Sequence, residues 1–187
     1  MSDFVPAVRL PDGVASLLAA ARTIFGEAHV RYAGFTICPE VPPYWLLSHM
    51  LEGTRYDLGP LLESAAFRQH CPDLAAGLNP DRTSNFEMLS PFSLSASLAD
   101  ALLGGGASLR RPSVQEAQSL ARDFTGAVLC DHHEQLAVLT SAAAWSDWFA
   151  CDVWDRTWIL ADQSCASVWL LSFTDSALPR RRRTSPP

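Results

Sequence analysis

The sequence predicts an α+β fold, in which a helical N-terminal half packs on a mostly antiparallel sheet from the C-terminal half. Three observations predict it. Apolar residues recur at helical spacing through much of the first half, and short β-type runs flank polar turns in the second. The 187 residues, 48% of them hydrophobic, also suffice to bury one core. We therefore expect a single domain over residues 1–179 and a disordered basic tail at 180–187.

The N-terminal half, residues 1–103, is expected to be rich in helices. The clearest helix is predicted at 11–26, where Asp12 can cap the first turn, Gly26 can end the last, and an apolar stripe lies between them. Aromatic and β-branched residues alternate loosely over 28–37, which predicts a strand. Further helices are expected at 43–53, 58–70 and 93–103, with a loop-like stretch at 71–92.

The strand-rich part, residues 113–179, follows a glycine-containing stretch at 104–112 that we expect to be a flexible connector. It begins with a capping box formed by Ser113 and Glu116, which predicts a helix over 113–124. Strands are expected to follow. We predict two hairpins, Gly126–Cys130 with Leu136–Thr140 and Arg156–Ala161 with Ser167–Thr174, and a short helix between them at 142–153.

All 14 basic residues are arginines, and the chain contains no lysine. Either a GC-rich genome or selection against lysine modification would produce this composition. The chemical consequence of this composition is the same in both cases. P-loop NTPases, protein kinases and Schiff-base enzymes are excluded in their usual forms, because each needs a lysine amine.

No run approaches the roughly 20 apolar residues of a membrane span, so no membrane contact is expected.

Acidic residues predominate in the C-terminal part of the body. Residues 112–179 carry 9 acidic residues and 2 arginines, against 11 and 8 in residues 1–111. Such a field repels nucleic-acid phosphates and attracts a basic protein, although acidity also serves solubility alone. We therefore expect no nucleic acid on the folded body. The four arginines at 180–183 allow contact with nucleic acid or membrane, or are simply a solvated end.

The five cysteines do not suggest a disulfide framework, because their number is odd and their spacing irregular in a chain of this length. The N-terminus has no basic region before an apolar stretch, so we expect a cytoplasmic protein with reduced thiols. Neither a cofactor nor a metal ion is expected. One alternative stays open: the run Cys130–Glu134 combines a thiol, two imidazoles and two carboxylates, as in a small Cys/His hydrolase or transferase, with or without zinc.

Five of the six tryptophans lie between residues 145 and 169, interleaved with aspartates. Tryptophan is enriched at interface hot spots, and neighbouring carboxylates steer a basic partner, although the same indoles would also fill a core. We predict a non-catalytic, acidic protein-binding module that binds a basic protein, of inhibitor or immunity type by analogy of composition alone. The expected contact residues are Trp145, Asp147, Trp148, Asp152, Trp154, Asp155 and Trp158.

Overall fold

The computed structural model describes residues 4–7, 12–38, 58–79, 85–105, 111–129, 136–150 and 154–175. Within these ranges, six strands form one antiparallel sheet in the order β1-β2-β6-β5-β4-β3. With helices packed on this sheet, the predicted α+β class is confirmed. The strands are β1 (Phe4–Pro6), β2 (Val30–Ile37), β3 (Glu87–Leu89), β4 (Leu136–Ser141), β5 (Arg156–Asp162) and β6 (Ser167–Phe173).

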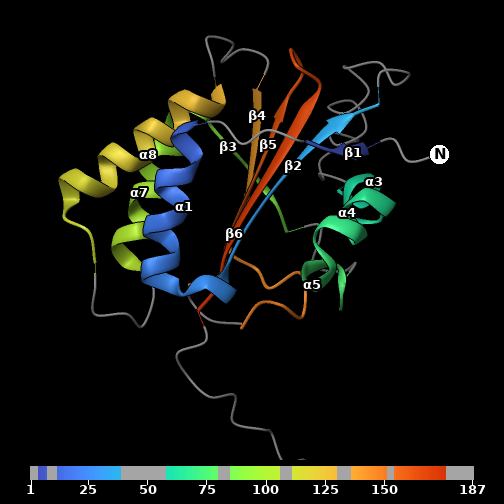
Figure 1. Ribbon diagram of the computed structural model, residues 1–187, viewed down its shortest axis with the longest axis horizontal. Helices are drawn as coiled ribbons and strands as arrows, with labels where there is room; N and C mark the ends of the chain where they lie inside the picture. Colours follow the sequence, from blue (N-terminus) through green and yellow to red (C-terminus); the bar gives the residue numbers. More distant parts are fainter. Residues whose placement is uncertain are drawn as a thin grey trace, which may run out of the picture.

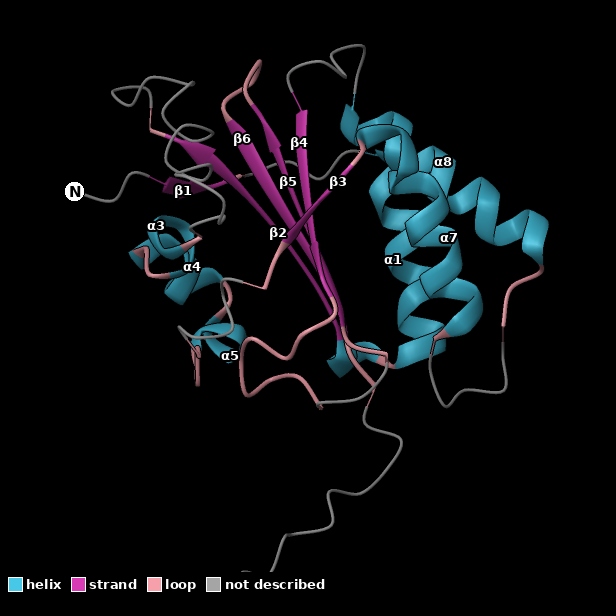
Figure 2. Ribbon diagram, turned by 180° about the vertical axis from the view of Figure 1, so that it is seen from behind, coloured by secondary structure: helices cyan, strands magenta, loops and turns pink. Residues whose placement is uncertain are grey.

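Helices lie on both faces of the sheet. The longer helices α1, α7 and α8 pack together on one face, and the short helices α3, α4 and α5 lie on the other (Figure 1). The view from behind shows the same three layers (Figure 2). The α-helices are α1 (Asp12–Phe25), α3 (Gly59–Leu62), α4 (Ala65–His70), α5 (Pro72–Ala75), α7 (Leu94–Gly104) and α8 (Val114–Leu129), with 3-10 turns η1 (Glu27–His29) and η2 (Pro91–Ser93).

Each face of the sheet has its own hydrophobic core, because side chains along a strand alternate between the two faces. On the face covered by α1, α7 and α8, Trp158 of β5 packs among residues such as Phe124. On the opposite face, Ile159 of the same strand packs with Phe67 and Trp145. Because both faces are covered, β5 and β6 are buried along almost their whole length.

Several sequence-based predictions are confirmed. The helix expected at 11–26 is α1, the strand at 28–37 contains β2, and the helix at 93–103 is α7. The second predicted hairpin is formed by β5 and β6. The helix start at 113 is also confirmed, since Ser113 Oγ accepts a hydrogen bond from the Glu116 backbone N–H at 3.2 Å.

The predicted first hairpin is wrong, because α8 runs through Gly126 to Leu129. Ala121, Phe124 and Val128 continue a buried stripe at helical spacing, and a Cβ atom at Gly126 would meet nothing within 4 Å. The glycine therefore lies on the solvent-exposed face of α8, and the opposite face of this helix packs into the core. β4 pairs with β3 and β5 instead.

The predicted helix at 142–153 is also wrong over its described part, since 142–150 forms bends and turns. Ser141 Oγ and Ser146 Oγ accept hydrogen bonds from nearby backbone N–H groups, which compete with a helical ladder.

The remaining differences concern the N-terminal half. Ser64 divides the helix expected at 58–70 into α3 and α4, because its side chain caps Phe67 N–H at 3.1 Å. The stretch 71–92, expected to be a loop, contains α5 and β3. The helix expected at 43–53, most of the connector 104–112, and the tail 180–187 lie outside the described residues.

Candidate functional site

A loop over residues 142–150, the β4 exit loop, carries three of the predicted contact residues and is fixed to two other parts of the fold. The Asn79 backbone N–H donates to Trp145 O at 3.0 Å, and the Asp147 N–H donates to Gly77 O at 3.1 Å. At its far end, the Ala150 N–H donates to Thr174 Oγ1 at 3.0 Å. The loop is therefore held between the segment after α5 and the end of β6.

Trp145 anchors this loop from inside the protein. Its side chain is 0% exposed, its ring lies 5.2 Å from the Phe149 ring in an edge-on arrangement, and Nε1 donates to Thr157 Oγ1 at 2.9 Å. An indole enclosed in this way cannot touch a partner at the surface. The placement of Trp145 on the contact surface is therefore corrected: it is a core residue.

Trp158 and Asp155 are also interior residues. The Trp158 side chain is 0% exposed, and its Nε1 donates to Ser97 Oγ at 3.0 Å under helix α7. Asp155 is 1% exposed, and its Oδ1 accepts a hydrogen bond from Thr174 Oγ1 at 2.6 Å. Their predicted contact role is corrected in the same way, since the fold uses both side chains to join its own elements.

The sheet separates the predicted contact residues into two groups. Trp145 and Trp148 belong to the face covered by α3, α4 and α5, whereas Trp154 and Trp158 belong to the face covered by α1, α7 and α8. Trp154 is half-buried beside the C-terminal end of α7. The seven residues therefore do not form one continuous surface, and Asp152 lies outside the described residues.

Trp148 remains partly exposed and is held in place by one residue far from it in sequence and by its neighbour Phe149. The Arg31 guanidinium carbon lies 5.5 Å from the centroid of the Trp148 ring, and the Phe149 ring packs edge-on against Trp148 at 5.0 Å. Arg31 in turn forms an ion pair with Asp73 of α5. Exposed Asp147 directly precedes the indole. We call Arg31, Asp73, Asp147 and Trp148 the Trp148 patch.

Several acidic side chains of the C-terminal half are buried in the protein. Asp155, Asp162 and Asp175 are buried. Asp162 Oδ1 caps the turn between β5 and β6, where it accepts from the Ser164 N–H at 2.7 Å and from Ser164 Oγ at 2.6 Å. The described carboxylates of residues 112–179 that reach the surface are those of Glu116, Asp123 and Asp147. Among the described residues, the exposed carboxylates are therefore fewer than the sequence count implies.

The buried cysteine of the described residues, Cys71, is not suited to nucleophilic catalysis. Burial, together with the smaller effect of Asp73, raises the pKa of Cys71 to about 12, and Arg31 partly opposes both. Because the thiolate is the nucleophile, this side chain is inert at neutral pH. Within the described residues, no three His, Cys, Asp or Glu side chains gather closely enough to hold a metal ion. The Cys130–Glu134 run lies outside them.

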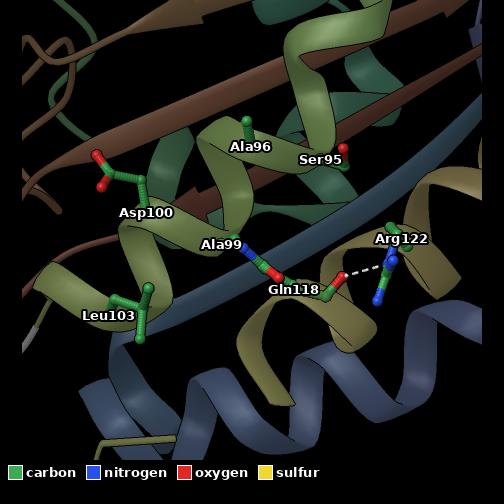
Figure 3. Close-up of a pocket in the computed structure, with 7 residues that line it drawn as sticks. All are labelled: Ser95, Ala96, Ala99, Asp100, Leu103, Gln118 and Arg122. Carbon is green, nitrogen blue, oxygen red and sulfur yellow. Dashed lines mark hydrogen bonds between the residues drawn. The ribbon is translucent and has the colours of Figure 1, made fainter. Parts of the chain in front are cut away.

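The described surface has several other hollows, two of which lie at α7 and at β3 to β5. One, of about 340 Å³, is a groove between α7 and α8 (Figure 3). In it Gln118 lies beside Ala99, while the Asp100 carboxylate points away from Arg122, so these two charges do not converge on one point. The other, of about 410 Å³, is lined by polar residues of β3, β4 and β5 that include Glu87, Thr140 and Arg156.

The Trp148 patch contains two residues that sequence reasoning missed. Arg31 lies on β2 and Asp73 on α5, and only the packing of α5 beside the end of the sheet brings them together. No local pattern in the sequence connects them.

No helix in the described part of the chain combines the length and apolar character needed to cross a membrane. Neither a protein-family model nor a curated protein sequence matches the chain.

Proposed function

We propose that this protein is a non-catalytic binding module, of inhibitor or immunity type, whose Trp148 patch contacts a basic protein. The observation that carries the proposal is the position of Trp148. Its indole is half-buried, so it keeps an exposed part, and it is fixed on a pinned loop. Interface hot spots favour rigid aromatic side chains of this kind.

Preorganisation supports the proposal energetically. Ordering a mobile side chain on binding costs about 0.5–1.5 kcal/mol, and a loop that must fold costs more. The Trp148 indole avoids much of this cost because Arg31 and Phe149 already hold its ring. The backbone of Asp147 and Trp148 is likewise fixed by hydrogen bonds to Gly77 O and Ser146 Oγ.

Charge supports a basic partner. Arg31 pairs with Asp73 within the patch, and Asp147 adds an exposed carboxylate next to Trp148. The chain as a whole carries a formal charge of −6, which steers a cationic protein toward it at low salt. A lysine or arginine of the partner would meet the Asp147 carboxylate while apolar parts of the partner cover the indole of Trp148.

Affinity capture from the native host tests this function when four forms of the protein are compared. These are the wild type, Trp148→Ala, Asp147→Asn, and Asp123→Asn as a control that removes one exposed carboxylate from α8. We expect the wild type and the control to retain the same basic protein. Trp148→Ala should retain at least tenfold less and Asp147→Asn several-fold less, and salt should weaken binding in every form.

Equal melting temperatures for the wild type and the Asp147→Asn variant would show that lost binding does not reflect unfolding. The proposal fails if all four forms retain the same proteins equally, or if Asp123→Asn reduces binding as much as Asp147→Asn does.

A further inference from the structure

The pairing of β2 with β6 brings two cysteines from distant parts of the sequence near each other, one at the end of β2 and one in the turn before β6. The last pair in the ladder is Thr36 with Ser167. One residue further, the Ile37 backbone N–H donates to Ala166 O at 2.7 Å, which continues the same register. Cys38 follows Ile37 and Cys165 precedes Ala166, so each cysteine lies one residue from this hydrogen bond.

Both cysteines are accessible, and both carry thiols. Cys38 is half-buried and Cys165 is exposed, whereas Cys71 is buried. Cys165 belongs to the turn 163–166 and not to β6, so its spacing from Cys38 is set by the turn and by the hydrogen bond between Ile37 and Ala166. A disulfide needs a Cα separation of about 4.4–6.8 Å, which two residues flanking one backbone hydrogen bond can reach.

The turn that carries Cys165 is held by hydrogen bonds. Asp162 caps Ser164 at the start of the turn, and Ser167 Oγ donates to Cys165 O at 3.0 Å. Ala166 adopts a left-handed conformation with φ 49°, which closes the turn before β6. Cys165 is therefore kept at the tip of the β5–β6 hairpin, next to the end of β2.

We propose that Cys38 and Cys165 form a reversible disulfide with a small-molecule disulfide such as oxidised glutathione as the oxidant. The exposed Cys165 thiolate attacks one glutathione sulfur, which breaks the glutathione S–S bond and releases one reduced glutathione. The Cys38 thiolate then attacks the Cys165 sulfur and releases the second. The protein loses two protons and two electrons, and one oxidised glutathione becomes two reduced molecules.

The consequence is a covalent link between the end of β2 and the β5–β6 turn. Such a link encloses most of the chain in one loop, which restricts the unfolded state and raises the melting temperature. The inference is independent of the Trp148 patch and stands if that patch binds nothing.

The test treats the full chain, first reduced and then freed of reductant, with oxidised glutathione. Remaining thiols are alkylated under native conditions, and the digest is analysed by mass spectrometry. We expect one cross-linked peptide containing Cys38 and Cys165, an unmodified Cys71, and a rise in melting temperature of about 5–10 °C that dithiothreitol reverses.

Two variants make the result specific. Cys165→Ser changes one exposed turn residue and should abolish both the cross-link and the rise in melting temperature, whereas Cys151→Ser should leave both intact. The proposal is overturned if Cys38 and Cys165 remain as separate glutathione adducts, or if either pairs with another cysteine instead.

Discussion

A buried tryptophan needs a partner for its indole N–H, and the fold supplies one for Trp145 and another for Trp158. Thr157 accepts from the first and Ser97 from the second. These hydrogen bonds allow two large side chains to enter opposite cores without leaving a polar group unsatisfied. Sequence alone cannot distinguish such residues from interface tryptophans, because both roles use the same apolar area and the same polar N–H group.

Cys71 makes stability depend on alkaline pH. Burial raises its pKa to about 12 in the folded protein, whereas a thiol in the unfolded chain titrates near about 8.5. Between these values the unfolded state loses the proton and the folded state keeps it. The free energy of unfolding should therefore fall as pH rises above about 8.5, with a slope that approaches about 1.4 kcal/mol per pH unit.

Urea unfolding at pH 7.5, 9 and 10 measures this slope. Cys71→Ala should lower stability at pH 7.5, where the thiol is protonated in both states, and should flatten the slope, because the buried thiol is gone. Cys165→Ala, which removes an exposed thiol, should keep the slope of the wild type. A wild-type slope unchanged by Cys71→Ala would contradict the assigned cause. The pH range stays at or below 10 because burial also raises the pKa of Tyr32.

At the scale of elements, the β4 exit loop illustrates how a segment without helix or strand becomes fixed. Its backbone bonds reach Gly77 and Asn79 after α5, and Thr174 after β6. Gly77 has φ +72°, and a Cβ atom there would lie 2.3 Å from Asp147 Oδ2. The glycine thus allows both the turn and the close approach of the loop.

Two glycine-to-alanine substitutions, one in this turn and one in α8, should change stability in opposite directions. Gly77→Ala should destabilise the protein by about 1–2 kcal/mol, from the left-handed backbone and the contact with Asp147, and should weaken partner binding by displacing that carboxylate. Gly126→Ala, in the open side of α8, should stabilise the protein by about 0.5–1 kcal/mol. Thermal unfolding of both measures the difference, and equal shifts would contradict the role given to Gly77.

The elements that sequence predicted correctly are those whose local signals agree with their packing. Asp12, the apolar stripe of α1 and Gly26 all favour one helix, and the β5–β6 hairpin has two apolar runs around a polar turn. The prediction of a strand at 126–130 was wrong because its residues suit either a strand or a helix. Val128 is buried in the same core as Phe124, four residues before it, and this packing extends α8 instead.

At the scale of the whole molecule, the sheet decides which side chains can act together. It places Trp148 and Trp154 on opposite faces although only a few residues separate them in sequence, and it brings Arg31 next to Asp73. The sequence therefore indicated Trp148 and Asp147 as candidate contact residues but did not indicate the neighbours that hold them. Such neighbours follow from the strand order and the position of α5, and neither is encoded in a local pattern.

Hydroxyl-radical footprinting of the purified complex with the captured partner tests the central claim most directly. Oxidation of Trp148 should fall several-fold on binding, while Met88, which is 53% exposed on edge strand β3, should react as before. Buried Trp145 provides an internal reference with little reaction in either state. Protection of Met88 with unchanged oxidation of Trp148 would place the interface elsewhere and contradict the account.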